Sequence, residues 1–191
     1  MTRRAGISNG SVLSAAAELV NSEGLEALSL TALAASLGVR TPSLYNHVAG
    51  LAGIRRQLAL KGTRELSERL ARSAIGKSED DAVEAMAGAY RAYVREQPGV
   101  YAAGVQAADP EDTELQAAEG DTVQVVLQVL EAYGLSGDDA LHAVRGLRSV
   151  VHGFASLEVS GGFGLALDLD ESFSRLVRSY IAGLHASRQR K

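Results

Sequence analysis

Five side chains between positions 41 and 47 can donate or accept hydrogen bonds, and these are Thr41, Ser43, Tyr45, Asn46 and His47. An Asn side chain matches the hydrogen-bonding edge of adenine, and hydroxyl groups suit phosphate oxygens. The same residues would also suit the solvated face of a helical hairpin. The chemistry that this segment could perform is therefore nucleic-acid recognition, with a plain solvated surface as the alternative.

A second set of polar side chains occurs in sequence that is otherwise apolar. His152 lies in the middle of an apolar helical pattern, where a core histidine is the alternative to a ligand contact. Tyr90, Tyr93 and Tyr101, together with Met86, could line a cavity between helices, and core packing explains each of them equally well. We expect these five residues to contact a neutral, mostly hydrophobic small molecule in an apolar cavity.

Signs of catalysis and of metal binding are weak. Asp138, Asp139 and His142 have helical spacing, but acids at a helix start favour capping and the helix dipole over metal binding. The chain has no phosphate-binding glycine loop, no cysteine and four scattered histidines. No nucleophile and base pair can be proposed from this set. We therefore expect neither an enzyme nor a bound cofactor or metal.

The composition limits the compartment and the number of domains. A chain of 191 residues can form one large domain or two unequal ones. The absence of cysteine fits a reducing cytoplasm. No run of 18 apolar residues occurs, and no apolar segment follows the basic start, so we expect neither a membrane span nor an export signal.

Charge is distributed unevenly along the chain. Residues 1–72 contain nine Lys or Arg against five Asp or Glu, whereas residues 73–191 contain ten against eighteen. A basic part followed by an acidic part is expected where one end of a protein meets a polyanion. Ordinary solvated domains also show such an imbalance, so charge alone does not decide the function.

Apolar residues recur at helical spacing almost everywhere, which predicts an all-α fold with about nine helices. Residues 1–72 form the expected N-terminal domain, with helices over 9–23, 29–37, 42–48 and 51–72. The charged segment 77–81 is the expected boundary. Residues 78–191 form the second domain, with helices over 79–96, 98–107, 111–133, 136–160 and 170–187. The helix over 111–133 could be interrupted near Gly120.

The segment Ser29–Val48 has the pattern of two short helices joined by a tight turn. Gly38 ends the first helix, Thr41 is the expected N-cap of the second, and Leu44 and Val48 face inward. In such a pair the second helix can enter the major groove of DNA while the first crosses the backbone. The segment therefore predicts a helix-turn-helix.

This segment also resembles the helix-turn-helix of the tetracycline-repressor (TetR) family. The resemblance is carried by Leu33-Ala34, Leu37-Gly38-Val39 and Pro42-Ser43-Leu44-Tyr45-Asn46-His47-Val48. It implies a homodimeric transcription regulator that binds an inverted-repeat operator in double-stranded DNA, usually as a repressor that a small molecule releases. The positions it implicates at the DNA are Thr31, Thr41, Pro42, Ser43, Tyr45, Asn46 and His47.

One position departs from the family pattern. The family usually has a Lys at the start of the fourth helix, where it holds a phosphate, and this chain has Leu51. The phosphate contact could pass to Arg55, to Arg56 or to a backbone N–H at the helix start. Arg40 and the basic pair at positions 3 and 4 are further candidates.

The second half of the chain resembles the C-terminal regulatory domain of the WHG type. The resemblance is carried by residues 148–158, 161–164 and 170–177, although the chain has no Trp. We expect the last two long helices to form a four-helix contact in the dimer. The apolar stripe from Phe173 to Leu184 would supply its surface, and Gly146, Gly153 and Gly183 would allow close approach.

Two interpretations follow from these patterns. We favour a DNA-binding regulator in which residues 1–72 bind DNA and residues 78–191 bind a partner subunit and a small molecule. The alternative is a helical ligand-binding or protein-interaction module that has lost DNA reading, and Leu51 is its best support.

Overall fold

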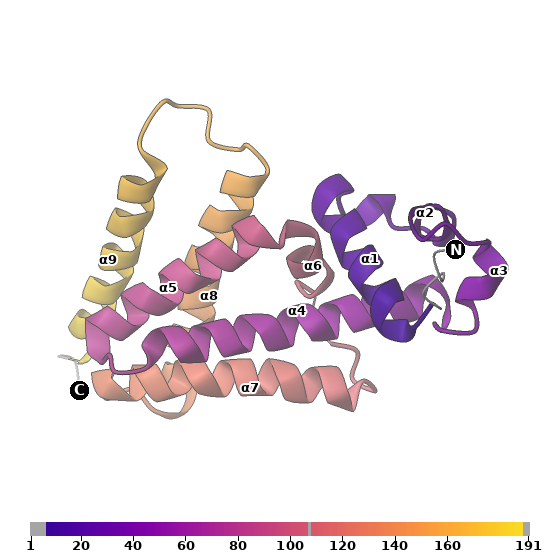
Figure 1. The fold of residues 1–191 in the computed structure, drawn as a ribbon. Coiled ribbons are helices and arrows are strands. Elements are labelled where there is room, and N and C mark those ends of the chain that lie inside the picture. The colour runs from indigo at the N-terminus through magenta and orange to yellow at the C-terminus, as the bar shows by residue number, and fades with distance from the viewer. Residues whose placement is uncertain (1–6, 107, 189–191) are drawn as a thin grey trace. The chain divides into compact units, whose positions relative to one another are not determined.

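The computed structural model describes residues 7–106 and 108–188, and within them the protein is all-α. The described residues form nine α-helices, in agreement with the number that the periodicity predicts, and two 3-10 turns (Figure 1). The helices are α1 (Asn9–Glu23), α2 (Leu30–Ser36), α3 (Thr41–Leu44), α4 (Gly50–Ala74), α5 (Glu79–Glu96), α6 (Pro98–Ala103), α7 (Thr113–Leu130), α8 (Gly137–Val159) and α9 (Leu169–Arg188). The 3-10 turns are η1 (Leu25–Ala27) and η2 (Glu131–Tyr133). None of the described helices is long and apolar enough to cross a membrane.

The chain divides into two compact units that are not consecutive in sequence. The first unit comprises residues up to Thr63 and residues 97–115, and the second comprises residues 64–96 and residues from Gln116 onward. Helix α6 and the start of α7 therefore pack with the N-terminal helices. The functional division into residues 1–72 and 78–191 remains a prediction, because compactness alone does not assign function.

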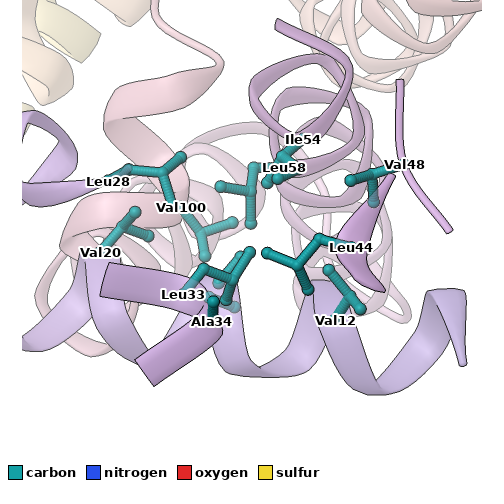
Figure 2. Close-up of a cluster of buried hydrophobic side chains, with 12 residues drawn as sticks. Val12, Val20, Leu28, Leu33, Ala34, Leu44, Val48, Ile54, Leu58 and Val100 are labelled. Carbon is teal, nitrogen blue, oxygen red and sulfur yellow. The ribbon is translucent and has the colours of Figure 1, made fainter. Parts of the chain in front are cut away.

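The core of the first unit is aliphatic and draws on five helices. Figure 2 shows side chains from α1, α2, α3, α4 and α6 directed toward one another. Val12, Leu33, Leu44, Ile54 and Val100, one from each of these helices, are all completely buried. Because each helix inserts at least one such side chain, the core fixes α3 relative to α2 and α4.

Helix α6 is held against α1 by a close backbone approach within the first unit. A Cβ at Gly99 would lie 2.0 Å from the carbonyl oxygen of Val20, so only glycine fits there. The Asn21 side-chain oxygen accepts hydrogen bonds from the N–H groups of Gly99 (3.0 Å) and Val100 (3.1 Å). These contacts cap the start of α6, where backbone donors lack partners inside the helix.

Several helix boundaries follow the sequence closely, and others do not. Helices α1 and α5 span the expected residues. Helix α3 ends at Leu44, four residues earlier than expected, and the following turn is closed by the Val48 N–H bonding to the Leu44 carbonyl (3.1 Å). Helix α7 runs without interruption through the exposed Gly120.

In the second unit α5, α8 and α9 pack together (Figure 1). A buried arginine on α5, Arg91, donates to Glu158 at the end of α8 (2.7 Å) and to Asp170 at the start of α9 (2.8 Å). Its guanidinium also lies over the rings of Phe154 and Phe173, 5.3 and 4.9 Å from their centroids. A charge that is desolvated in this way needs these partners.

The prediction that the apolar stripe of α9 supplies the dimer surface is wrong. Phe173, Val177, Ile181 and Leu184 are all buried inside the second unit of a single chain. Periodicity identifies an apolar stripe but not the surface against which it packs, and here it packs within the chain. Gly146 likewise accommodates the ring of Tyr180 on α9, which a Cβ at that position would meet at 3.1 Å.

Candidate nucleic-acid interface

The turn between α2 and α3 is built around Gly38. Its φ of +66° is in the left-handed region, where a side chain would be strained. The turn is closed by backbone hydrogen bonds from Val39 to Ala34 (2.9 Å) and from Gly38 to Ala35 (3.1 Å). Ser29 caps the start of α2 by accepting from the N–H of Ala32 (3.1 Å). The Ser29 cap and the Gly38 turn thus define the two ends of α2, and the turn determines where α3 begins.

Helix α3 and the turn after it have one buried side and one exposed side. Leu44 is completely buried and Val48 is 8% exposed, as the sequence predicts. On the other side Tyr45 is 61% exposed, and Pro42 and Asn46 are also exposed. Thr41, Ser43 and His47 are half-buried. The segment presents donors and acceptors to solvent over a rigid apolar base, as contact with a groove requires.

The remaining candidates lie in the same compact unit. Thr31 in the first turn of α2, Arg40 just before α3 and Arg55 on α4 are all exposed. Residues 3 and 4, the basic pair named above, lie outside the described residues. All nine predicted DNA contacts are therefore in one unit, and none of them is fully buried.

The contacts of α4 indicate which residue could bind a phosphate in place of the Lys that the family usually has where this chain has Leu51. Leu51 is half-buried and packs against the core of the first unit. Arg56 is occupied, because it bonds to Asp112 and Glu114. Arg55 makes no hydrogen bond or ion pair with the residues that the structure describes. Of the two arginines, Arg55 is therefore the one available for a phosphate.

The acidic partners of Arg56 and the capping role of Asn21 are missed by sequence reasoning. Asp112 and Glu114 lie 56 and 58 residues from Arg56, and Asn21 lies 78 residues from Gly99. No periodicity connects positions so far apart. The only local signal is Asp112 in front of Thr113 and Glu114, which is typical of a helix start.

The predicted effector residues fall into both units. Met86, Tyr90 and Tyr93 on α5 are buried and His152 on α8 is half-buried in the second unit, whereas Tyr101 on α6 belongs to the first. The structure does not bring Tyr101 into the second unit with the other four.

Two of these side chains have defined polar surroundings. The Tyr93 hydroxyl donates to Glu65 at 3.2 Å, and Arg69 lies 5.1 Å from the centre of its ring. Burial raises the pKa of Tyr93 far above its usual range, so its hydroxyl stays protonated. Burial, and secondarily Arg148, lowers the pKa of His152, which favours a neutral ring.

A hollow of about 580 Å³ lies along α8 and α9 in the second unit. Asp139, His142 and Tyr180 are among its lining residues, whereas none of the five predicted effector residues is. Asp138 and Asp139 lie in the first turn of α8, where the helix dipole favours acids. Among the described residues no group of three or more potential ligands could hold a metal ion.

The buried base and exposed polar surface of α2 and α3 define a helix-turn-helix protein. Comparison with known proteins gives its family. Residues 12–47 match the family model "Bacterial regulatory proteins, tetR family", and residues 83–180 match "Tetracyclin repressor-like, C-terminal domain". The chain belongs to the TetR family of transcriptional regulators and is not an enzyme.

The relatives agree with this assignment over nearly the whole chain. An uncharacterized HTH-type transcriptional regulator of Bacillus subtilis, YobS, is 36% identical over 96% of both chains. A similar regulator of Mycobacterium tuberculosis is 36% identical over 96% of this chain and 84% of its own.

Solved structures share the fold at lower identity. A protein of unknown function from Rhodococcus sp. RHA1 has a TM-score of 0.80 and 21% identity, and the match covers 95% of this chain and 97% of that one. A TetR variant from Acinetobacter baumannii in complex with minocycline has a TM-score of 0.73 and 24% identity, with 96% and 99% coverage.

Proposed function

We propose that this regulator is a repressor that binds an inverted-repeat operator as a homodimer in the cytoplasm and is released by a small hydrophobic molecule. The observation that carries the proposal is the exposed polar surface from Thr41 to His47 over the buried Leu44. Two such surfaces related by a two-fold axis require two half-sites about 34–36 Å apart, or a multiple of that spacing.

Within this surface we assign base reading to Asn46 and phosphate contact to Arg55. Both side chains are exposed, and Arg55 carries no ion pair with a described residue. Thr31, Arg40, Thr41, Pro42, Ser43, Tyr45 and His47 complete the proposed interface. An exposed Asn can bond to adenine through two hydrogen bonds, which supports a role in sequence preference.

The proposal is tested by titrating the protein with DNA flanking its own gene and with scrambled DNA, over a series of salt concentrations. Asn46→Ala should weaken operator binding by about 1–3 kcal/mol and relax one base position. The matched control is Gln124→Ala, at an exposed amide on α7 in the second unit, and it should bind like the wild type. Equal sequence preference in Asn46→Ala and Gln124→Ala would contradict the assignment.

The effector site that we propose lies in the second unit between α5 and α8. Packing of α5 on α8 and the buried Met86, Tyr90 and Tyr93 support it, and His152 supplies a neutral polar contact. Tyr101 belongs to the first unit, so the set that we propose within the second unit is Met86, Tyr90, Tyr93 and His152, and we expect the WHG-type domain to form the pocket. The Acinetobacter baumannii protein in complex with minocycline shows a relative of this fold with a small molecule.

The dimer that we propose uses the outer face of α8 and α9. Leu157 is 49% exposed, and a Cβ added at Gly153 or Gly183 would meet no other atom, so this face is open in a single chain. Close helix approach at glycines supports an isologous contact.

A second candidate function is a helical ligand-binding module that no longer reads DNA. Leu51 favours it, because this side chain packs into the core instead of offering a positive charge. Salt-independent failure to bind any duplex DNA would support this second function over the first.

A further inference from the structure

Arg56 on α4 is held by two carboxylates from a distant part of the chain. Its Nε and Nη2 atoms donate to the two oxygens of Asp112 at 2.5 and 2.7 Å, and Nη2 also donates to Glu114 at 2.9 Å. All three residues belong to the first unit. This two-pronged geometry is also the one in which a guanidinium binds a phosphate.

Arg56 shares the exposed side of α4 with the proposed phosphate contact. Ala52, Arg55 and Arg56 are exposed, while Ile54 and Leu58 are buried. The exposed residues are spaced by three and four positions, so they lie on one face of the helix. Arg56 is therefore a neighbour of Arg55 on the helix that follows the helix-turn-helix.

The position of Asp112 is fixed by a contact that does not involve Arg56. Asp112 accepts a hydrogen bond from the N–H of Leu115 (3.1 Å) and so caps the start of α7. Its carboxylate is mostly covered, with 13% of the side chain exposed. Because α7 holds Asp112 in place, the carboxylate is a preformed competitor for the Arg56 guanidinium.

The acids near Arg56 also change the formal charge of the first unit. Positions 1–63 contain six Lys or Arg against three Asp or Glu, but positions 97–115 contain no Lys or Arg and four acids. The two segments that fold together therefore carry a formal charge of −1, although the first segment alone is at +3. The acids of 97–115 offset the basic charge of the proposed DNA-binding residues.

We propose that Arg56 is a second phosphate-binding residue that Asp112 and Glu114 keep occupied, and that this pair of acids lowers the affinity of the first unit for the DNA backbone. This inference rests on the proposed DNA-binding function. A phosphate that approaches α4 must displace carboxylates already seated on Arg56, and it meets their negative charge as well. Removing both charges makes the guanidinium available.

The test uses the full chain and a labelled duplex of arbitrary sequence, because the backbone contribution does not depend on sequence. The variant is D112N/E114Q, in which the amide that replaces the Asp112 carboxylate can still cap α7. It should bind more tightly than the wild type, and its plot of log K against log salt should steepen by about 0.9, which is the value for one added phosphate contact on duplex DNA. R56Q alone should leave the slope of the wild type unchanged.

Two controls separate this effect from a general change of charge. E23Q/E26Q removes two exposed negative charges from the same unit, away from the contacts of Arg56, and should not steepen the slope. Adding R56Q to D112N/E114Q should restore the wild-type slope. Circular dichroism melting of each variant verifies that it is folded.

The outcomes are distinct. If D112N/E114Q steepens the slope to the same extent with and without Arg56, the added affinity is a general charge effect and the inference is wrong. If the wild type binds DNA with a salt dependence that D112N/E114Q leaves unaltered, the inference fails while the proposed function stands. If no variant binds any duplex at low salt, both are overturned.

Discussion

Replacing Gly99 by alanine should separate α6 from α1 and destabilise the first unit strongly. The new Cβ would lie 2.0 Å from the Val20 carbonyl oxygen and 2.8 Å from the Asn21 nitrogen, whereas real Cβ atoms essentially never approach within 3.0 Å. The two backbones must therefore move apart by about 1 Å, since neither contacted atom belongs to a flexible side chain.

The magnitude follows from what that movement breaks. Overpacking a tight contact costs about 1–3 kcal/mol. The hydrogen bonds from Gly99 and Val100 to Asn21 contribute about 1 kcal/mol each and are lost or stretched. We therefore expect Gly99→Ala to lower the free energy of unfolding by about 3–5 kcal/mol, which is a large share of the stability of a small domain.

The assay is urea unfolding followed by circular dichroism, with Gly88→Ala as the matched control. Gly88 is an exposed position inside α5, and a Cβ there meets no other atom. Alanine at this position should stabilise the protein by about 0.5–1 kcal/mol, because helical alanine loses less entropy than glycine. The two glycine substitutions thus have opposite expected signs.

A double-mutant cycle gives the refuting result. Asn21→Ala should cost about 2 kcal/mol in the wild type and much less in Gly99→Ala, because the same hydrogen bonds are already disrupted. If Asn21→Ala costs the same in both backgrounds, or if Gly99→Ala and Gly88→Ala unfold at the same urea concentration, the close approach of α6 and α1 is not what stabilises this unit.

Two further predictions concern the second unit. The hydrogen bonds from Arg91 hold the pKa of Glu158 below its ordinary value of 4.5, so this contribution to stability is present above pH 4.5 and lost as the pH falls through the lower folded value. The variant Glu158→Gln should already be destabilised by about 3 kcal/mol at pH 7. Below pH 4.5 the melting temperature of the wild type should fall more steeply than that of the variant. Parallel pH profiles of the two proteins would contradict this. Gly153→Glu should yield folded monomers in sedimentation, while Gly88→Glu, also on an open helix surface, should remain dimeric. A dimeric Gly153→Glu would exclude the outer face of α8 and α9 as the dimer contact.

Local features of the chain were predictable because short-range chemistry decides them. Helix α1 ends at Glu23 because Gly24 has a φ of +88°, and α2 begins after the capping Ser29. The inward direction of Leu44 and Val48 was also correct, although the helix stops at Leu44. The turn closed between these two residues keeps both side chains on the core side. The prediction that both are buried is therefore correct even though residues 45–48 are not helical.

Contacts between distant segments were not predictable, because apolar spacing identifies a buried stripe without naming its partner. The sequence pattern predicts a dimer contact for the stripe from Phe173 to Leu184, whereas this stripe packs inside one chain. Sequence order alone places residues 98–107 beside the C-terminal helices, whereas Val100 on α6 is buried in the core of the first unit. In both cases the deciding contact joins segments with no shared local signal.

The same limit applies to electrostatics, and it changes what the charge of this chain implies. By sequence, residues 1–72 form a basic segment suited to a polyanion, but folding brings the acids of positions 97–115 into the same unit. DNA binding by this protein therefore cannot depend on an excess of basic charge over the whole unit. It must depend on where individual charges are exposed, because screening in salt confines their influence to about 8–10 Å.

Arg55 and Arg56 are adjacent in sequence and have opposite electrostatic surroundings. Arg55 is exposed and has no acidic partner among the described residues, whereas Arg56 is occupied by Asp112 and Glu114. In our proposal, the strength of the phosphate contact is set by which arginine the carboxylates of Asp112 and Glu114 reach.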